Sequence, residues 1–183
     1  MVVLVEGDSD AIALSTLAER LGLDLAASGV HIEPMGGATS VVHAVRRWGP
    51  AGARLAGLCD VREAPHYVRA LRAAGYGDEL AVDDLPALGF GICVADLEDE
   101  LIRSLGAAAV IDVLAAEGEL RAFRTLQRQP AQRDRPIEAQ LRRFLGTRSG
   151  RKASAARALA GALDLSRIPA PLRVVLDTIR PSG

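Results

Sequence analysis

Aromatic residues and cysteines are scarce in this chain of 183 residues. It contains three phenylalanines, two tyrosines and one tryptophan, so that aromatic side chains make up 3% of a sequence that is 49% hydrophobic. The core must therefore be built from aliphatic side chains, which favours helices packed on an aliphatic sheet. The two cysteines, Cys59 and Cys93, stand in apolar stretches without metal-site spacing. They predict buried, reduced thiols in a cytoplasmic protein.

Long apolar runs and an excess of either charge are also absent. The formal net charge is −1 and the isoelectric point lies near 6.3. No global field therefore attracts nucleic acid, and any such contact needs a local basic patch. No stretch is long enough to cross a bilayer, and the first residues contain no basic and apolar leader. These absences predict an intracellular protein with no membrane partner.

The opening residues predict a strand followed directly by a helix. Residues 2–5 are four aliphatic residues, three of them β-branched, and Glu6 and Gly7 end the run before a helical pattern that carries Asp10 in its first turn. In an open α/β sheet, ligands bind at this edge. Two converging carboxylates repel each other, so Glu6 and Asp10 indicate either a divalent-cation site or the ordinary end of a strand and start of a helix.

Strands and helices alternate through the first hundred residues. Such alternation is typical of parallel β-α-β units, in which right-handed crossovers gather the strand-ending loops at one edge. We therefore predict an α/β fold with a mostly parallel four-stranded sheet flanked by helices. The expected strands cover residues 2–5, 30–34, 54–60 and 90–94, and the expected helices cover 11–21, 41–48 and 64–74.

Acidic residues concentrate at the ends of the expected strands. Asp60 ends the third strand, and Asp96 and residues 98–100 follow the fourth. Because the carboxyl ends of parallel strands meet at one edge, these acids are expected to gather near Glu6. The acids after the fourth strand stand at helical spacing and cannot all point one way. Asp96 or Asp99 is therefore expected to support a site from behind its direct ligands.

The chain becomes helical after residue 105. We predict an α/β core over 1–105 and a helical extension over 106–183, whose helices either form a homodimer contact or cover the sheet. Breaks at prolines and glycines separate the expected helices. They cover residues 107–120, 121–129, 137–145, 152–163 and 171–179.

The extension is rich in arginine between residues 121 and 157. This composition indicates either a local positive surface for nucleic acid or a set of solvated arginines with no ligand. Arg142, Arg148 and Arg151 are the candidate nucleic-acid contacts.

These motifs, taken in order, resemble the TOPRIM domain of the OLD (overcoming lysogenization defect) family of ATP-dependent endonucleases. The resemblance spans residues 2 to about 163 and implies a TOPRIM-like, Rossmann-like fold. The residues that carry it are Val5-Glu6-Gly7-Asp8-Ser9-Asp10, the Gly36-Gly37 loop, Asp60, Asp96-Leu97-Glu98-Asp99-Glu100-Leu101-Ile102, and Lys152 before an alanine-rich helix.

The resemblance implies cleavage of phosphodiester bonds in DNA or RNA with Mg²⁺ or Mn²⁺, in the form of two ions. Hard cations take carboxylate oxygens, and a nearby lysine offsets the charge of the transition-state phosphate. Lys152 and Glu6 are the implied catalytic residues. The implied metal ligands are Glu6, Asp10, Asp60 and Glu98, with support from Glu63, Asp96 and Asp99.

Two departures from the family pattern leave alternatives open. TOPRIM domains carry Asp-x-Asp after the third strand, but here Arg62 stands in place of the second acid, and Glu63 follows one residue later. Arginine cannot ligate a metal, so the second metal position is in question. The sequence also has no Walker A motif, which predicts either a stand-alone TOPRIM protein or one whose ATPase is a separate chain. The alternative function is a catalytically weak module that binds nucleic acid or that ATPase.

Overall fold

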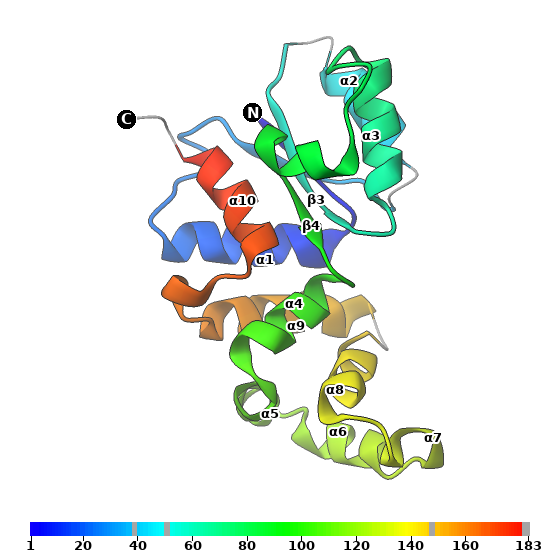
Figure 1. The fold of residues 1–183 in the computed structure, drawn as a ribbon. Coiled ribbons are helices and arrows are strands. Elements are labelled where there is room, and N and C mark those ends of the chain that lie inside the picture. Colours follow the sequence, from blue (N-terminus) through cyan, green and yellow to red (C-terminus); the bar gives the residue numbers. More distant parts are fainter. Residues whose placement is uncertain (38–39, 50–51, 147–148, 181–183) are drawn as a thin grey trace.

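A parallel β-sheet forms the centre of the molecule (Figure 1). The computed structural model describes residues 1–37, 40–49, 52–146 and 149–180. All strand pairs are parallel, in the order β2-β1-β3-β4. The predicted four-stranded parallel α/β fold is confirmed. The strands are β1 (Val2–Val5), β2 (His31–Pro34), β3 (Leu55–Asp60) and β4 (Phe90–Cys93).

The two faces of the sheet bury alternate residues of its central strands. In β1, Val3 and Val5 join one apolar cluster, whereas Val2 and Leu4 join another. This is the two-residue period of a strand buried on both faces. The first face is covered by α1 (Asp8–Arg20) and α10 (Ala170–Ile179), and the second by α2 (Val41–Trp48) and α3 (Ala64–Ala73).

The direction of winding reverses at β1. The chain passes from β1 through α1 to β2 on one side, and then through α2 to β3 on the other side of β1. Right-handed crossovers in opposite directions place their helices on opposite faces. The carboxyl ends of β1 and β3 therefore lie at the topological switch point, where open α/β sheets bind ligands.

The helices after the sheet divide into two groups in space. The first group extends away from the sheet, and the second returns to it (Figure 1). Segment 106–183, expected as one extension, thus contributes to both parts, and α10 covers the sheet. The first group comprises α5 (Ala107–Ala116), α6 (Leu120–Gln127), α7 (Pro130–Arg133) and α8 (Ile137–Leu145), after α4 (Leu97–Leu105); the second comprises α9 (Ser149–Ala162) and α10.

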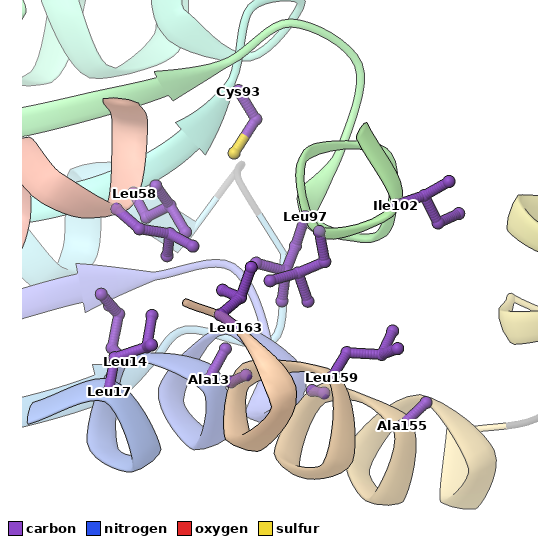
Figure 2. Packing of buried hydrophobic residues seen from close by; sticks show 14 of the residues in the cluster. Ala13, Leu14, Leu17, Leu58, Cys93, Leu97, Ile102, Ala155, Leu159 and Leu163 are labelled. Atoms are coloured by element: carbon purple, nitrogen blue, oxygen red, sulfur yellow. The ribbon is translucent and has the colours of Figure 1, made fainter. Parts of the chain in front are cut away.

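Helix α9 packs along α1 and so reaches the edge of the sheet where the strands have their carboxyl ends. Leu159 and Leu163 lie against Ala13 and Leu14 in a shared cluster of aliphatic side chains (Figure 2). Because α1 starts at the carboxyl end of β1, a helix aligned with it brings one of its own ends to that edge. The amino-terminal turn of α9 carries Lys152 there.

Several helix boundaries differ from those expected. The helix predicted over 107–120 ends at Ala116, because Gly118 adopts a positive φ of 72° and reverses the chain. Sequence analysis did not anticipate the 3₁₀ segments Val82–Leu88 and Leu165–Arg167. Within the described residues, no helix has the length and apolar character needed to cross a membrane.

Candidate metal centre

A polar cleft of about 320 Å³ opens at the carboxyl ends of β1 and β3. It draws its acidic side chains from three separate parts of the chain: the β1–α1 turn, the end of β3 and the start of α4. Sequence analysis expected these parts to meet at one edge. The charged residues that line the cleft are Glu6, Asp8, Asp10, Asp60, Asp96, Glu98 and Lys152.

Backbone hydrogen bonds fix the position of Glu6 and Asp10. The amide of Gly7 donates to Asp10 Oδ2 at 2.9 Å, which holds the Asp10 side chain across the first turn of α1. The amide of Gly37 donates to the carbonyl oxygen of Glu6 at 3.1 Å. Gly36 and Gly37 reach this position with φ values of 72° and 132°, which only glycine adopts readily. The Gly36-Gly37 loop thus forms one wall of the cleft.

Glu98 is the most deeply buried acid in the cleft. It stands in the first turn of α4, where the helix dipole favours a carboxylate, and is 7% exposed. Its Oε1 atom is buried and accepts no hydrogen bond, although Lys152 Nζ lies 3.4 Å away. A buried carboxylate oxygen without a hydrogen bond is costly. Glu98 is therefore ready to accept a cationic ligand.

Lys152 is the only lysine in the chain, since the other 21 of its 22 basic side chains are arginines. Its side chain is 44% exposed, whereas the Glu98 side chain is 10% exposed. A lysine provides a compact and mobile point charge, whereas an arginine provides a planar fork. This position thus carries the chain's one small cation, at the mouth of an acidic cleft.

The crowding of carboxylates raises their pKa values. Burial, followed by the charge of Glu6 and other neighbouring acids, raises the pKa of Asp60 to about 7. Burial also raises the pKa of Asp10 to about 6, although the hydrogen bond from Gly7 acts in the opposite direction. Burial and then the charge of Glu63 raise the pKa of Glu6, and Lys152 opposes them. Without a cation, these carboxylates destabilise one another when ionised.

The raised pKa of Asp60 predicts a pH-dependent cost to stability in EDTA. The folded protein holds this proton more tightly than the unfolded chain does. Protonation of Asp60 therefore makes its full contribution to the free energy of unfolding below the ordinary pKa of 3.8, and this contribution is lost as pH rises through about 7. Asp60→Asn should therefore stabilise the protein at pH 8 by roughly 1 kcal/mol, a value reduced for solvent screening, and by much less at pH 4.

Urea unfolding at pH 4 and pH 8 measures this difference. Asp83→Asn, at an exposed position of the 3₁₀ segment Val82–Leu88, is the matched control and should have the same effect at both pH values. An Asp60→Asn gain that does not grow between pH 4 and pH 8 would contradict the expected mutual destabilisation.

The donor set fits a hard divalent cation. Glu6, Asp10, Asp60 and Glu98 offer carboxylate oxygens on one cleft, and Glu98 Oε1 has no hydrogen-bond donor. In the described ranges, no three acidic, histidine or cysteine side chains are close enough to form a metal site as they stand. Coordination therefore requires side-chain rotation within the cleft, including exchange of the contact between Lys152 and Glu98.

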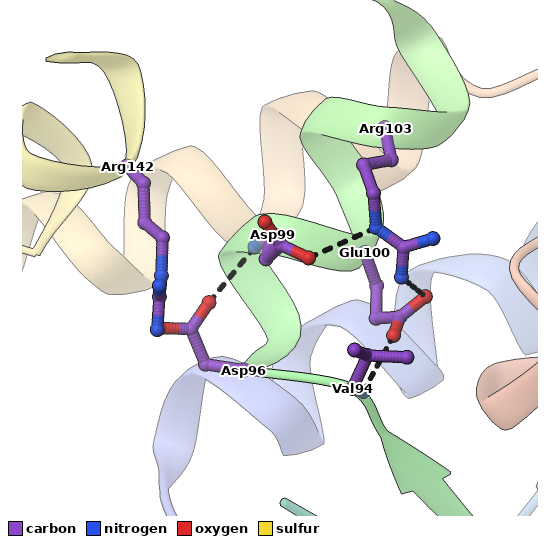
Figure 3. A network of polar contacts seen from close by, with 6 residues as sticks. All are labelled: Val94, Asp96, Asp99, Glu100, Arg103 and Arg142. Atoms are coloured by element: carbon purple, nitrogen blue, oxygen red, sulfur yellow. Dashed lines mark hydrogen bonds and ion pairs between the residues drawn. The ribbon is translucent and has the colours of Figure 1, made fainter. Parts of the chain in front are cut away.

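Asp99 and Glu100 do not line the cleft and contact Arg103 instead (Figure 3). Arg103 holds both, through Asp99 Oδ2 at 2.9 Å and Glu100 Oε2 at 2.6 Å. The second oxygen of Glu100, Oε1, accepts from the amide of Val94 at 2.9 Å. Sequence analysis did not predict these contacts, which fix the β4–α4 connection. An arginine three residues after an acid on a helix was a usable signal for them.

Asp96 lies at the rim of the cleft and starts α4. Its Oδ1 accepts from the amide of Asp99 at 2.9 Å, as a helix N-cap does. Its Oδ2 accepts from Nε of Arg142 at 2.7 Å and lies 2.6 Å from Nη2 of the same residue (Figure 3). Asp96 thus supports the helix that carries Glu98 and joins it to α8.

The remaining predicted residues lie outside the cleft lining. Arg62 is exposed, and Glu63 is half-buried with its Oε2 3.6 Å from Nε2 of His66. Arg151 is 12% exposed and pairs with Glu119 at 2.9 Å, so its side chain is held among the helices. Arg148 falls outside the residues that the structure describes.

Comparisons with known proteins agree with the fold and the opening motif. Residues 1–61 match the family described as overcoming lysogenization defect protein-like, TOPRIM domain. The C-terminal region of the Xanthomonas campestris pv. campestris OLD protein superimposes with a TM-score of 0.71 at 25% identity, over 97% of this chain and 92% of that one. The C-terminal region of the Burkholderia pseudomallei OLD protein gives a TM-score of 0.70 at 22% identity, over 97% and 95%.

No curated protein sequence matches the chain. The sequence match covers β1, α1, β2, α2 and β3, up to the residue after Asp60, and the structural match extends through the helices. Residues 1–61 thus match an OLD-like TOPRIM domain, and the fold of the chain is similar to that of the C-terminal region of OLD proteins.

Proposed function

We propose that this chain is a divalent-metal-dependent nuclease that hydrolyses phosphodiester bonds in nucleic acid. The observation that carries the proposal is the meeting of four carboxylates and the only lysine in one cleft at the sheet's switch point. The buried Oε1 of Glu98 without a hydrogen bond supports a cationic ligand at that place. Mg²⁺ and Mn²⁺ are the cations that suit an all-oxygen site of this kind.

Five residues of the cleft have a role in the proposed reaction. Glu6, Asp10, Asp60 and Glu98 would hold the cation, which would polarise the phosphodiester and make water a better nucleophile. Lys152 Nζ would offset the negative charge that builds up on the phosphate oxygens. Glu6 faces the same cleft, where its carboxylate would accept the proton of the attacking water.

A cleavage assay tests the proposal. Supercoiled plasmid and total RNA are incubated with the protein in Mg²⁺, Mn²⁺ or EDTA, and wild type is compared with Glu6→Ala. Cutting that requires a metal and is lost in Glu6→Ala supports the nuclease and identifies its substrate. Intact substrate with both proteins in every metal would contradict it.

A catalytically weak module is the second candidate, because Arg62 takes the place of an acid after β3. Arg62→Asp should raise divalent-metal affinity by about tenfold, since it adds an oxygen ligand beside Asp60 and removes a cation. Arg62→Ala is the matched control, because it removes the charge without adding a ligand. Calorimetric titration with Mn²⁺ measures both. Equal affinities of the Asp and Ala variants would exclude a metal position at residue 62.

The proposal also concerns partners and location. We propose that an ATPase acts together with this chain, as the resemblance to OLD proteins implies, and that the protein is cytoplasmic. Cys59 and Cys93 are buried free thiols, which suits a reducing compartment. For a homodimer, α10 packs one face on the sheet and leaves Ala170 and Asp177 exposed on the other.

A further inference from the structure

A second cavity, of about 340 Å³, lies beside the acidic cleft. It is lined by Asp96, Arg135, Ala139, Arg142, Arg143 and Gly146. Asp96 lines both cavities, so the two adjoin at this one residue. Three guanidinium groups and a single carboxylate line this cavity. The second cavity therefore has a net positive charge and adjoins the negatively charged cleft.

Two of the three arginines form no ion pair within the described part of the chain. Arg142 is held by Asp96, with Nη2 2.6 Å from Oδ2. Arg135 and Arg143 are exposed, and neither forms an ion pair with any residue that the structure describes. The cavity therefore has one oriented guanidinium and two that are available to a ligand.

The arginines come from elements that are fixed in place. Residues 139, 142, 143 and 146 stand at the three- and four-residue spacing of one helix face in α8 and its C-cap. Gln140 is 6% exposed, and its Nε2 donates to the carbonyl oxygens of Gln132 and Arg135, each at 2.9 Å. This side chain ties the turn that carries Arg135 to α8. The cavity is thus part of the folded helical region.

We propose that Arg135, Arg142 and Arg143 form a phosphate subsite for the backbone of a nucleic-acid strand that continues into the acidic cleft. The proposal rests on the proposed function for the identity of the strand. Guanidinium groups bind phosphate oxygens through two parallel hydrogen bonds. The cavity has no aromatic lining on which a base could stack. Binding there therefore depends on phosphates and is independent of base sequence.

Binding in EDTA tests this subsite apart from cleavage. Fluorescein-labelled 30-mers of single-stranded DNA, duplex DNA and RNA are titrated by anisotropy at several salt concentrations. The variant is Arg135→Ala/Arg143→Ala, which leaves the Asp96–Arg142 pair in place. We expect about tenfold weaker binding of the preferred probe, and a salt slope lowered by roughly 1.4 to 1.8, since each of the two phosphate contacts contributes about 0.7 to 0.9.

Arg46→Ala/Arg54→Ala is the matched control. It removes the same charge from exposed positions near the amino end of β3, at the sheet edge opposite the cleft. This control should bind within twofold of wild type. Equal losses in both double variants, or no binding of any probe by wild type, would overturn the subsite.

The outcomes for the subsite and the nuclease are distinguishable. Arginine-dependent binding in EDTA without cutting in any metal would support the subsite and contradict the nuclease. Metal-dependent cutting with binding that ignores Arg135 and Arg143 would do the reverse.

Discussion

Glu98→Gln is expected to reduce metal-dependent cleavage by at least about 100-fold while the protein remains folded. The substitution keeps the size of a side chain that is only 10% exposed and removes its charge. It removes a carboxylate whose Oε1 has no hydrogen bond and so takes away a metal ligand in the proposed site. Initial cleavage rates at saturating Mg²⁺ and Mn²⁺ measure the effect.

A stability measurement distinguishes the loss of a metal ligand from the loss of the fold as the cause of reduced cleavage. Because the substitution also removes a buried charge, thermal unfolding in EDTA should occur at or above the wild-type temperature. Glu79→Gln, an exposed glutamate outside the cleft lining, is the control and should leave cleavage unchanged. Wild-type cleavage rates in Glu98→Gln would remove Glu98 from the site.

Lys152→Met should lower cleavage by about 100- to 1,000-fold, because it deletes the positive charge that offsets the transition-state phosphate. Metal affinity should stay the same or rise, since Glu98 loses the ammonium group that lies 3.4 Å away. The cleavage rate and a Mn²⁺ titration, measured on one preparation, separate the two effects. Weaker metal binding together with lost cleavage would mean that Lys152 acts on the metal site and not on the phosphate.

The single lysine allows a second, independent test of the same role. An amine-specific reagent can modify only Lys152 and the terminal amine of Met1. The Met1 amine donates to the carbonyl oxygen of Gly29 and does not line the cleft. Acetylation of wild type should therefore lower cleavage as Lys152→Met does. An oligonucleotide added with Ca²⁺ should protect Lys152 from the reagent, which peptide mass spectrometry detects. Full activity of protein acetylated at Lys152 would contradict the role.

Strand-forming residues made the sheet predictable from sequence. The β-branched run before Glu6 and the apolar run of β3 that ends at Asp60 are short and are bounded by turn residues, which favours buried strands. Once the strands were known to be parallel, the rule for right-handed crossovers was enough to bring Glu6 and Asp60 to one edge. This part of the site followed from local sequence and general topology.

Contacts between distant helices were not predictable in the same way. Asp96 and Arg142 are 46 residues apart, and no local pattern indicates that α8 returns to the start of α4. The place of Lys152 was expected only through the family resemblance, because the path of α9 along α1 depends on side-chain packing. The contact of Arg151 with Glu119 is another long-range pair that local sequence did not indicate, and Arg151 had been expected to face nucleic acid.

Anomalous diffraction from crystals grown with Mn²⁺ locates a bound cation directly. We expect a manganese peak within the cleft, among the carboxylates of Glu6, Asp10, Asp60 and Glu98, and its loss in crystals of Glu98→Gln. Wild-type crystals at saturating Mn²⁺ with no peak in this cleft, or with a peak that Glu98→Gln leaves in place, would contradict it.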